Sequence, residues 1–223
     1  MLAPPAPKPA EPMPPFDPAE ADSYPVVTGV DEAGRGALCG PVVAAAVWFE
    51  PTALPPELLA GLDDSKKLAP PRREALAAEI RARCRVAVAA RSARAIDREG
   101  IVGATMEAMR RAVERLGLDA PIRADGRDTP PGLRAPCEAV IRGDGSVPQI
   151  AAASIVAKTT RDALMRRVAL RWPHYGWASN KGYGADAHLA ALAAHGPCAH
   201  HRRSFAPVAA LLAPAVDTAR TAD

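Results

Sequence analysis

The chain has few of the features that mark secreted, membrane or zinc-cluster proteins. Its 223 residues include only four cysteines, Cys39, Cys84, Cys137 and Cys198, which lie far apart and form no C-x-x-C pair. This spacing predicts reduced thiols and argues against a zinc ribbon or a compact disulfide framework. No apolar run reaches the length of a membrane span, and the N-terminus lacks the basic and apolar regions of a signal peptide. We therefore expect a cytoplasmic protein that does not contact a membrane.

The charge of the chain is also small. A net charge of +3 does not by itself indicate a nucleic-acid partner, while 48% hydrophobic residues suffice for one substantial core. Basic side chains nevertheless concentrate in the later part of the chain, where they either bind phosphates or form a solvated face. They are Arg166, Arg167, Arg171, Lys181, Arg202 and Arg203.

Proline divides the N-terminus from the rest of the chain. Eight of the first 18 residues are proline. Because hardly any periodic apolar signal accompanies them, residues 1–24 are predicted to form a disordered leader. We expect the main domain over residues 25–172, a C-terminal helical region that contacts a ligand over 173–212, and a flexible tail over 213–223.

The most informative stretch is residues 26–36, where a β-branched run ends in two carboxylates and a glycine-flanked arginine. The run predicts a buried strand. Neighbouring side chains of a strand point to opposite faces, so Asp31 and Glu32 can share one site only if the backbone turns there, which Gly34 and Gly36 permit. Two adjacent acids at the end of a buried strand are costly to desolvate unless cations compensate them. This is the first indication of a metal site.

Two further acids follow predicted strands. A strand over residues 120–124 leads to Asp125, and one over 138–142 leads to Asp144. Carboxylate oxygens suit Mg²⁺ and Mn²⁺, and two such ions about 4 Å apart can activate a water and stabilise a leaving oxygen in a phosphoryl displacement. Asp-Gly sequences are also common in turns, so each of these acids taken singly could instead cap a turn.

The remaining pattern predicts alternating strands and helices. A second buried strand, over residues 41–49, forms a hairpin with the first. A helix over 70–83, a strand over 85–90 and a helix over 101–116 that stops at Gly117 come next. Ser146 and Gln149 form a possible capping box for a helix that runs to about Trp172. Its exposed face is expected to carry Lys158, Arg161, Asp162, Arg166 and Arg167, with Asp162 in a structural ion pair.

Short blocks stand in a characteristic order over residues 25–208. They are Asp31-Glu32-Ala33-Gly34-Arg35-Gly36 with Gly40-Pro41-Val42-Val43, Asp64-Ser65-Lys66-Lys67-Leu68, Ile96-Asp97, Asp125-Gly126, Gly143-Asp144, Ile150 to Lys158, Lys181-Gly182-Tyr183-Gly184, His195-Gly196-Pro197 and His201-Arg202-Arg203-Ser204-Phe205. In this order they resemble the bacterial ribonuclease HII family. The resemblance implies an α/β fold of the ribonuclease H-like kind, a mixed five-stranded sheet flanked by helices, with a small C-terminal helical region.

The resemblance also implies a reaction. It makes Asp31, Glu32, Asp125 and Asp144 the catalytic acids that hold two Mn²⁺ or Mg²⁺ ions. The substrates would be RNA·DNA hybrids and duplex DNA that contains single ribonucleotides, nicked on the 5′ side to leave 3′-hydroxyl and 5′-phosphate ends. Such an endoribonuclease removes misincorporated ribonucleotides and RNA primers. We expect a monomer.

Further residues are assigned to substrate contact by the same resemblance. Gly34, Arg35 and Gly36 would sense the ribose 2′-hydroxyl, since glycines let the backbone approach a sugar closely, and Tyr183 would pack against the neighbouring deoxyribose. Four cations either hold phosphates or are simply solvated: Lys66, Lys67, Lys181 and Arg203.

Three alternatives remain open at this stage. His195, Cys198, His200 and His201 lie close enough in sequence to suggest zinc, but they lack two separated ligand pairs, so structural hydrogen bonding is favoured. The related type III ribonuclease H departs from this chain at Gly34-Arg35-Gly36. A hybrid-binding protein without catalysis would have no use for four acids, which repel phosphate unless cations are bound.

Overall fold

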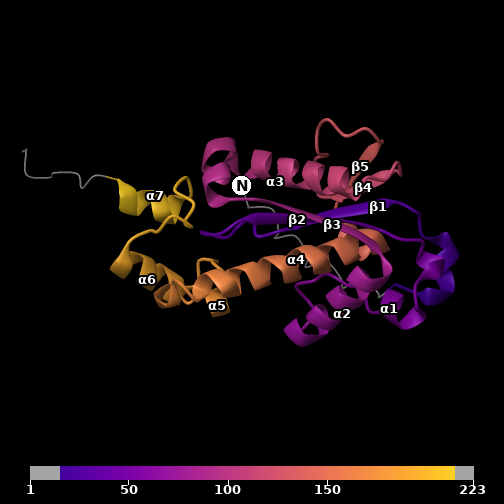
Figure 1. The fold of residues 1–223 in the computed structure, drawn as a ribbon, viewed down its shortest axis with the longest axis horizontal. Helices are drawn as coiled ribbons and strands as arrows, with labels where there is room; N and C mark the ends of the chain where they lie inside the picture. The colour runs from indigo at the N-terminus through magenta and orange to yellow at the C-terminus, as the bar shows by residue number, and fades with distance from the viewer. Residues whose placement is uncertain (1–15, 214–223) are drawn as a thin grey trace, which may run out of the picture.

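The computed structural model describes residues 16–213, which form a mixed five-stranded sheet with helices on both faces (Figure 1). This confirms the predicted fold class. In chain order the elements are η1 (Pro18–Ser23), β1 (Thr28–Ala33), β2 (Val42–Trp48), η2 (Pro51–Ala53), α1 (Pro56–Ala60), α2 (Pro70–Arg83), β3 (Arg85–Arg91), α3 (Ala93–Leu116), β4 (Ile122–Asp125), β5 (Cys137–Val140), η3 (Gly143–Gly145), α4 (Pro148–Ala169), η4 (Pro173–Tyr175), α5 (Trp177–Asn180), α6 (Asp186–His195) and α7 (Ala206–Leu212).

The strand order is β3-β2-β1-β4-β5, which puts β1 at the centre of the sheet. β1 pairs with β2 and β2 with β3 in antiparallel fashion, as the predicted hairpin requires, whereas β1, β4 and β5 run parallel. Because parallel strands end at the same edge of a sheet, the acids at the ends of β1 and β4 meet there. The η3 turn, which follows β5, adds a third acidic segment to this edge.

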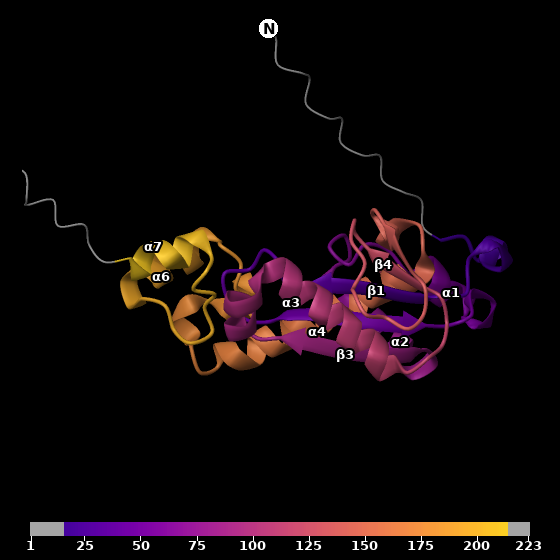
Figure 2. The same ribbon diagram turned by 90° about the horizontal axis from the view of Figure 1, so that it is seen from above.

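Helix α3 covers one face of the sheet, and α4 with α2 covers the other (Figure 1). Alternate residues of β1 serve the two faces: Val30 packs in the core under α3, and Ala33 in the core under α4. Helices α5, α6 and α7 gather at one end of the molecule, beyond the sheet (Figure 2). Within residues 16–213, no helix combines the length and apolar character that a bilayer span requires.

The start of α4 lies unusually close to β1. A Cβ atom on Gly29 would stand 2.1 Å from the backbone carbon of Gln149, so only glycine fits at this position of the strand. The predicted capping box is wrong: α4 begins after Val147 and has no side-chain cap. Gln149 instead donates its side-chain amide to the carbonyl oxygens of Pro25 and Phe49, at 2.8 and 3.1 Å. These acceptors would otherwise lack a donor, and a buried carbonyl without one is costly.

Local turn chemistry is predicted well around α2 and α3. The helix over 70–83 has the predicted bounds, and the following strand extends one residue beyond the predicted 85–90. Gly117, with φ +69°, ends α3 as expected. Gly100, with φ +73°, interrupts the helical path of α3, so the regular part over residues 101–116 begins where the apolar periodicity starts.

The N-terminal boundary of the fold differs from the prediction. Phe16 is buried in the core under α4, and its ring packs edge-to-face with that of Tyr24, with centroids 5.6 Å apart. Between them, Asp17 caps η1 by accepting from the backbone of Ala19 at 2.9 Å. The disordered leader is therefore wrong for residues 16–24, because two aromatic side chains anchor a proline-rich segment. Residues 1–15 and 214–223 lie outside the described residues.

Candidate active site

Three segments bring the predicted acids to one edge of the sheet. Asp31 and Glu32 lie within β1, Asp125 is the last residue of β4, and Asp144 lies in η3. Asp31 is 6% exposed, and the charges of both Glu32 and Asp125 act on it. Asp125 also acts on Glu32 and Asp144. The backbone turn expected at Asp31 and Glu32 is absent, since both belong to the strand and the chain turns only after Ala33. The turn is not needed for the two acids to interact, because the charge of Glu32 acts on the Asp31 carboxyl and the charge of Asp125 acts on both.

The pKa values of three of these carboxyls are raised. Burial, followed by the negative charges of Glu32 and Asp125, raises the pKa of Asp31 well above its usual range. Burial raises the pKa of Glu32 although the guanidinium of Arg35, 3.4 Å away, opposes the shift. Burial and then Asp125 raise the pKa of Asp144. A bound cation would relieve these like charges.

Hydrogen bonds orient the acids without neutralising them. The backbone N–H of Glu32 donates to Asp31 Oδ1 at 2.7 Å, and the backbone N–H of Gly143 donates to Asp125 Oδ1 at 2.8 Å. The second bond links the end of β4 to the turn that carries Asp144. Ser154, on α4, partly opposes the raised pKa of Asp31. Nothing in the local sequence pattern indicates a role for Ser154.

The donor set fits a hard divalent cation. All four candidate ligands are carboxylates, the ligand type that Mg²⁺ and Mn²⁺ prefer. Within residues 16–213, no three His, Cys, Asp or Glu side chains already stand as ligands of a single ion. The acids thus lie near one another without forming a closed ligand shell, and their mutual repulsion and burial are what a cation would offset.

A pocket of about 380 Å³ adjoins the acids. It joins parts that lie far apart in sequence, namely Glu32 with the 34–36 loop, Ser65 and Lys66 after α1, Ser154 and Lys158 on α4, and Tyr183 after α5. The Ser65 and Ser154 hydroxyls are 2.8 Å apart at its wall. The pocket therefore connects the predicted catalytic and sugar-sensing elements.

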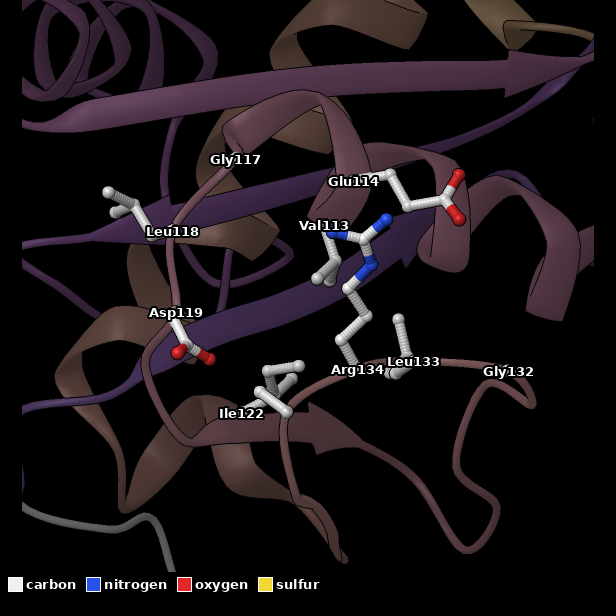
Figure 3. A pocket seen from close by; sticks show the side chains of 10 residues that line it. Val113, Glu114, Gly117, Leu118, Asp119, Ile122, Gly132, Leu133 and Arg134 are labelled. Atoms are coloured by element: carbon white, nitrogen blue, oxygen red, sulfur yellow. The ribbon is translucent and has the colours of Figure 1, made fainter.

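A larger cavity, of about 690 Å³, lies elsewhere. Figure 3 shows Ile122 and Val113 among its lining residues, with Glu114, Asp119 and Arg134 carrying its charges. Ile122 begins β4 and Asp125 ends it, so the cavity is at the opposite end of that strand from the acids. It contains none of the predicted site residues.

In the loop after β1, the fold requires a glycine at position 34 but not at position 36. Gly34 has φ +97°, and a Cβ atom there would stand 1.9 Å from Arg161 Nε. Gly36 has no positive φ, and a Cβ atom there would meet nothing within 4 Å. Gly34 is therefore required by the fold, whereas Gly36 leaves open space on the side of the pocket.

Two buried arginines hold the same loop, and sequence reasoning missed both. Arg161, expected on the exposed face of α4, is fully buried and donates to the carbonyl oxygens of Pro41 and Cys39 at 3.0 and 3.1 Å. Arg202 is fully buried as well and donates to carbonyl oxygens of Gly34, Arg35 and Gly40. The predicted exposed face is confirmed for Arg166 and Arg167 but wrong for Arg161, because the loop and the C-terminal region pack over that part of α4.

Asp162, next to Arg161 on α4, is also buried. Its carboxylate pairs with Lys158 Nζ at 2.7 Å and with Arg73 Nη2 at 3.3 Å. This confirms the structural ion pair predicted with Lys158, although Asp162 is buried rather than exposed. Arg166 pairs with Glu74 instead.

The four predicted phosphate contacts differ in position. Burial lowers the pKa of Lys66, but the carboxylates of Asp64, Asp31, Asp144 and Asp125 outweigh it and raise the pKa, so Lys66 faces the acids. Lys67 is exposed and pairs with Asp63 at 3.0 Å. The ammonium of Lys181 bonds to the carbonyl of Ala178, and the exposed Arg203 donates its backbone N–H to Asp97.

Tyr183 stands at the mouth of the pocket, 36% exposed. Its ring centroid is 5.1 Å from Arg161 Cζ and 5.7 Å from Lys158 Nζ, so cations support the ring from α4. Its carbonyl oxygen accepts from His188 Nδ1 at 2.8 Å. Tyr183 and Lys158 thus both line the pocket next to the acids.

The histidines of the C-terminal region serve packing. His201 Nδ1 accepts from the backbone N–H of Cys198 at 3.0 Å, and its Nε2 lies 3.2 Å from that of the buried His188. Burial lowers the pKa of His201 to about 4, so the ring is neutral at physiological pH. The bond from the Cys198 backbone is of the structural kind favoured for His201.

Comparison with solved structures places the fold in the ribonuclease H-like class. The chain is similar to ribonuclease HII of Archaeoglobus fulgidus, solved in a complex with PCNA, with a TM-score of 0.69 and 29% identity over 85% of this chain and 98% of that one. It shares the fold of ribonuclease H2 from Pyrococcus horikoshii, with a TM-score of 0.68 and 24% identity over 83% of this chain and 96% of that one.

Sequence comparison narrows the class to one family. The model of the Ribonuclease HII family matches residues 28–208. Ribonuclease HII of Rhizobium meliloti is 50% identical over 85% of this chain and 86% of its own length, and that of Paramagnetospirillum magneticum is 50% identical over 82% and 92%. The chain belongs to the ribonuclease HII family. It is an endonuclease of the ribonuclease H type, a class that cleaves the RNA strand of RNA·DNA hybrids.

Proposed function

We propose that this chain nicks duplex DNA on the 5′ side of a single embedded ribonucleotide and leaves 3′-hydroxyl and 5′-phosphate ends. The observation that carries the proposal is the pocket of about 380 Å³, which places Glu32 and the 34–36 loop around one space. A group that recognises the sugar therefore adjoins a group that could act on the neighbouring phosphate. The same activity would remove misincorporated ribonucleotides and residual RNA primers.

The four acids are proposed to hold two divalent cations, Mn²⁺ or Mg²⁺. Such ions, when bound, activate a water and stabilise the leaving oxygen of an in-line displacement. Asp31, which is buried and oriented by the Glu32 backbone, would supply the most rigid ligand. Asp125, oriented by the Gly143 backbone, would keep the acid of β4 in register with Asp144.

The residues around the pocket are proposed to position the sugar and the phosphates. Gly36 leaves space for a close approach of the ribose. Tyr183 offers an exposed ring face against which the next sugar would pack. Lys66 faces the acids and would contact a phosphate near the scissile bond. Phosphate contacts by Lys67, Lys181 and Arg203, and a monomeric state, stay predictions.

The proposal is tested by comparing three substrates: duplex DNA with one ribonucleotide, the matching all-DNA duplex, and a long RNA·DNA hybrid. Each is incubated in Mg²⁺, in Mn²⁺ and in EDTA. We expect a metal-dependent nick immediately 5′ of the lone ribonucleotide, with the all-DNA duplex intact. Cleavage of the long hybrid alone would contradict the proposed role of the 34–36 loop. Tight binding without any cleavage would point to a non-catalytic hybrid binder.

A further inference from the structure

The buried Arg202 does not pair with a carboxylate. Arg202 is 0% exposed, and within residues 16–213 no acidic side chain lies within 4 Å of its guanidinium nitrogens. Burial, and then the positive charge of Arg161, lower the pKa of Arg202 to about 10, so the side chain remains charged at neutral pH. A buried charge persists only where polar groups compensate it.

Carbonyl oxygens of a single loop provide that compensation. Arg202 Nη2 donates to Gly34 O at 2.7 Å, Nη1 to Arg35 O at 2.7 Å, and Nε to Gly40 O at 3.1 Å. All three acceptors belong to the turn between β1 and β2. The planar guanidinium therefore fixes the start and the end of this turn at once, which a lysine ammonium could not do with the same geometry.

The backbone around Arg202 is itself held from two sides. Its N–H donates to Leu38 O at 2.9 Å, so it pairs with the loop that its side chain grips. On the other side, Asp97 of α3 accepts from the backbone N–H of Arg203 at 3.1 Å and from that of Ser204 at 2.9 Å. Asp97 thus connects the helix on one face of the sheet to the segment that carries Arg202.

We propose that Arg202 is a positioning residue that sets the shape of the 34–40 loop before substrate binds, with Asp97 supporting it, and that it thereby sets the preference for a lone ribonucleotide. The second half rests on the proposed function of the loop as a sugar sensor. A lone ribonucleotide offers one 2′-hydroxyl to align the scissile phosphate, whereas every residue of an RNA strand offers one. Loosening the loop should therefore impair nicking at a lone ribonucleotide more than cleavage of a hybrid.

The test uses R202K and D97N in the full chain, with R85K as the matched control. Arg85 is exposed on β3 and pairs with Trp48, at the end of the sheet away from the acids. Two quantities are measured: amide hydrogen exchange of residues 34–40, and kcat/KM on the lone-ribonucleotide duplex divided by that on the long hybrid. Circular dichroism establishes that each variant is folded.

In R202K we expect exchange in residues 34–40 to accelerate at least tenfold while helix α3 keeps its protection, and the kcat/KM ratio to fall at least tenfold. D97N should change both quantities in the same direction by about threefold, and R85K should change neither. If R202K does not fold, the exchange rates and the kcat/KM ratio of D97N test the proposal.

Unchanged exchange, or equal losses on both substrates, would overturn the positioning role. If the wild-type enzyme does not nick the lone-ribonucleotide duplex at all, the proposed function fails. Hydrogen exchange then decides by itself whether Arg202 holds the loop.

Discussion

The acidic edge of the sheet and the 34–40 loop meet at one pocket, yet their charges are balanced in opposite ways. At the edge, Asp31 is buried, Glu32 and Asp144 are partly buried, and nearby carboxylates help to raise the pKa values of all three. In the loop, the buried cations Arg161 and Arg202 donate to five backbone carbonyls, although Nη1 of Arg161 has no hydrogen-bond partner among the described residues. The edge gathers negative charges that the chain compensates only in part, whereas most of the charge held in the loop is compensated by the chain itself.

The acidic edge has to bind cations, whereas the 34–40 loop has to be rigid. A site for metal ions gains affinity from charges that the folded chain leaves uncompensated, at a cost in stability. A surface that distinguishes sugars by one hydroxyl gains from backbone that does not move when the substrate arrives. The following predictions test this contrast, beginning with the largest expected effect.

Replacing either central acid should remove turnover and spare binding. In D31N or D125N we expect kcat to fall by about a thousandfold or more, because a metal-binding carboxylate is lost. Affinity for hybrid, measured in Ca²⁺ or EDTA by fluorescence anisotropy, should change by less than about threefold. The control is D119N, an exposed acid at the far cavity. Turnover that persists in D31N would show that the acidic edge is not the catalytic centre.

The two glycines of the loop should respond very differently to alanine. G34A places a Cβ atom 1.9 Å from Arg161 Nε at a positive φ, so we expect a loss of about 2–4 kcal/mol in the free energy of unfolding. G36A meets open space and should change it by less than about 1 kcal/mol. Urea denaturation measures both values. Equal effects would mean that the loop is not held against Arg161.

The acidic edge should make the metal-free enzyme less stable as pH rises. A carboxyl whose pKa is raised on folding binds more protons in the native state, so stability falls as pH increases from about 4 through the raised native pKa. D31N should weaken this slope and raise stability at pH 7 in EDTA by about 1 kcal/mol. Thermal unfolding from pH 4 to 8 measures the slope. A steeper fall in D31N would contradict the buried repulsion.

Divalent ions should restore the stability that the metal-free enzyme loses through repulsion between its acids. At pH 7, Mg²⁺ or Mn²⁺ should raise the unfolding temperature of the wild-type enzyme, and the rise should grow with the logarithm of the ion concentration above Kd. The rise should be smaller in D31N, because one ligand is missing, and Ca²⁺-free EDTA buffer serves as the reference. Equal shifts in both proteins would place the ion elsewhere.

The smallest effects are expected at the neighbouring lysines. Lys66 lines the same pocket as Glu32, and the charges of Asp31, Asp125 and Asp144 act on it, so K66A should lower kcat/KM about tenfold. Lys67 forms only an exposed pair with Asp63, so K67A should change it by less than about twofold. Steady-state rates at 0.1 M salt separate the two. Equal losses would indicate that both lysines contact phosphate.

Much of this protein could be predicted from its sequence. The β-branched run at 26–33, the helix at 70–83 and the stop at Gly117 depend on local periodicity and turn chemistry, which neighbouring residues dictate. The order of short motifs identified the family. The four acids were predicted because carboxylates follow predicted buried strands and because they match the acids of the family's motifs; their catalytic role stays a prediction.

Only the tertiary structure decided which residues support that site. Arg161 has the helical spacing of a solvated charge, and its burial depends on a loop more than a hundred residues away that needs donors for its carbonyls. Gly34 and Gly36 look alike in the sequence, but Arg161 fills the space beside only one of them. Phe16 and Tyr24 likewise anchor residues 16–24, because their rings pack on each other and against core residues that lie far away in the sequence. Local sequence pattern determines which helices and strands form. Contacts between distant segments determine which groups compensate a buried charge and which side chains fill the space beside a residue.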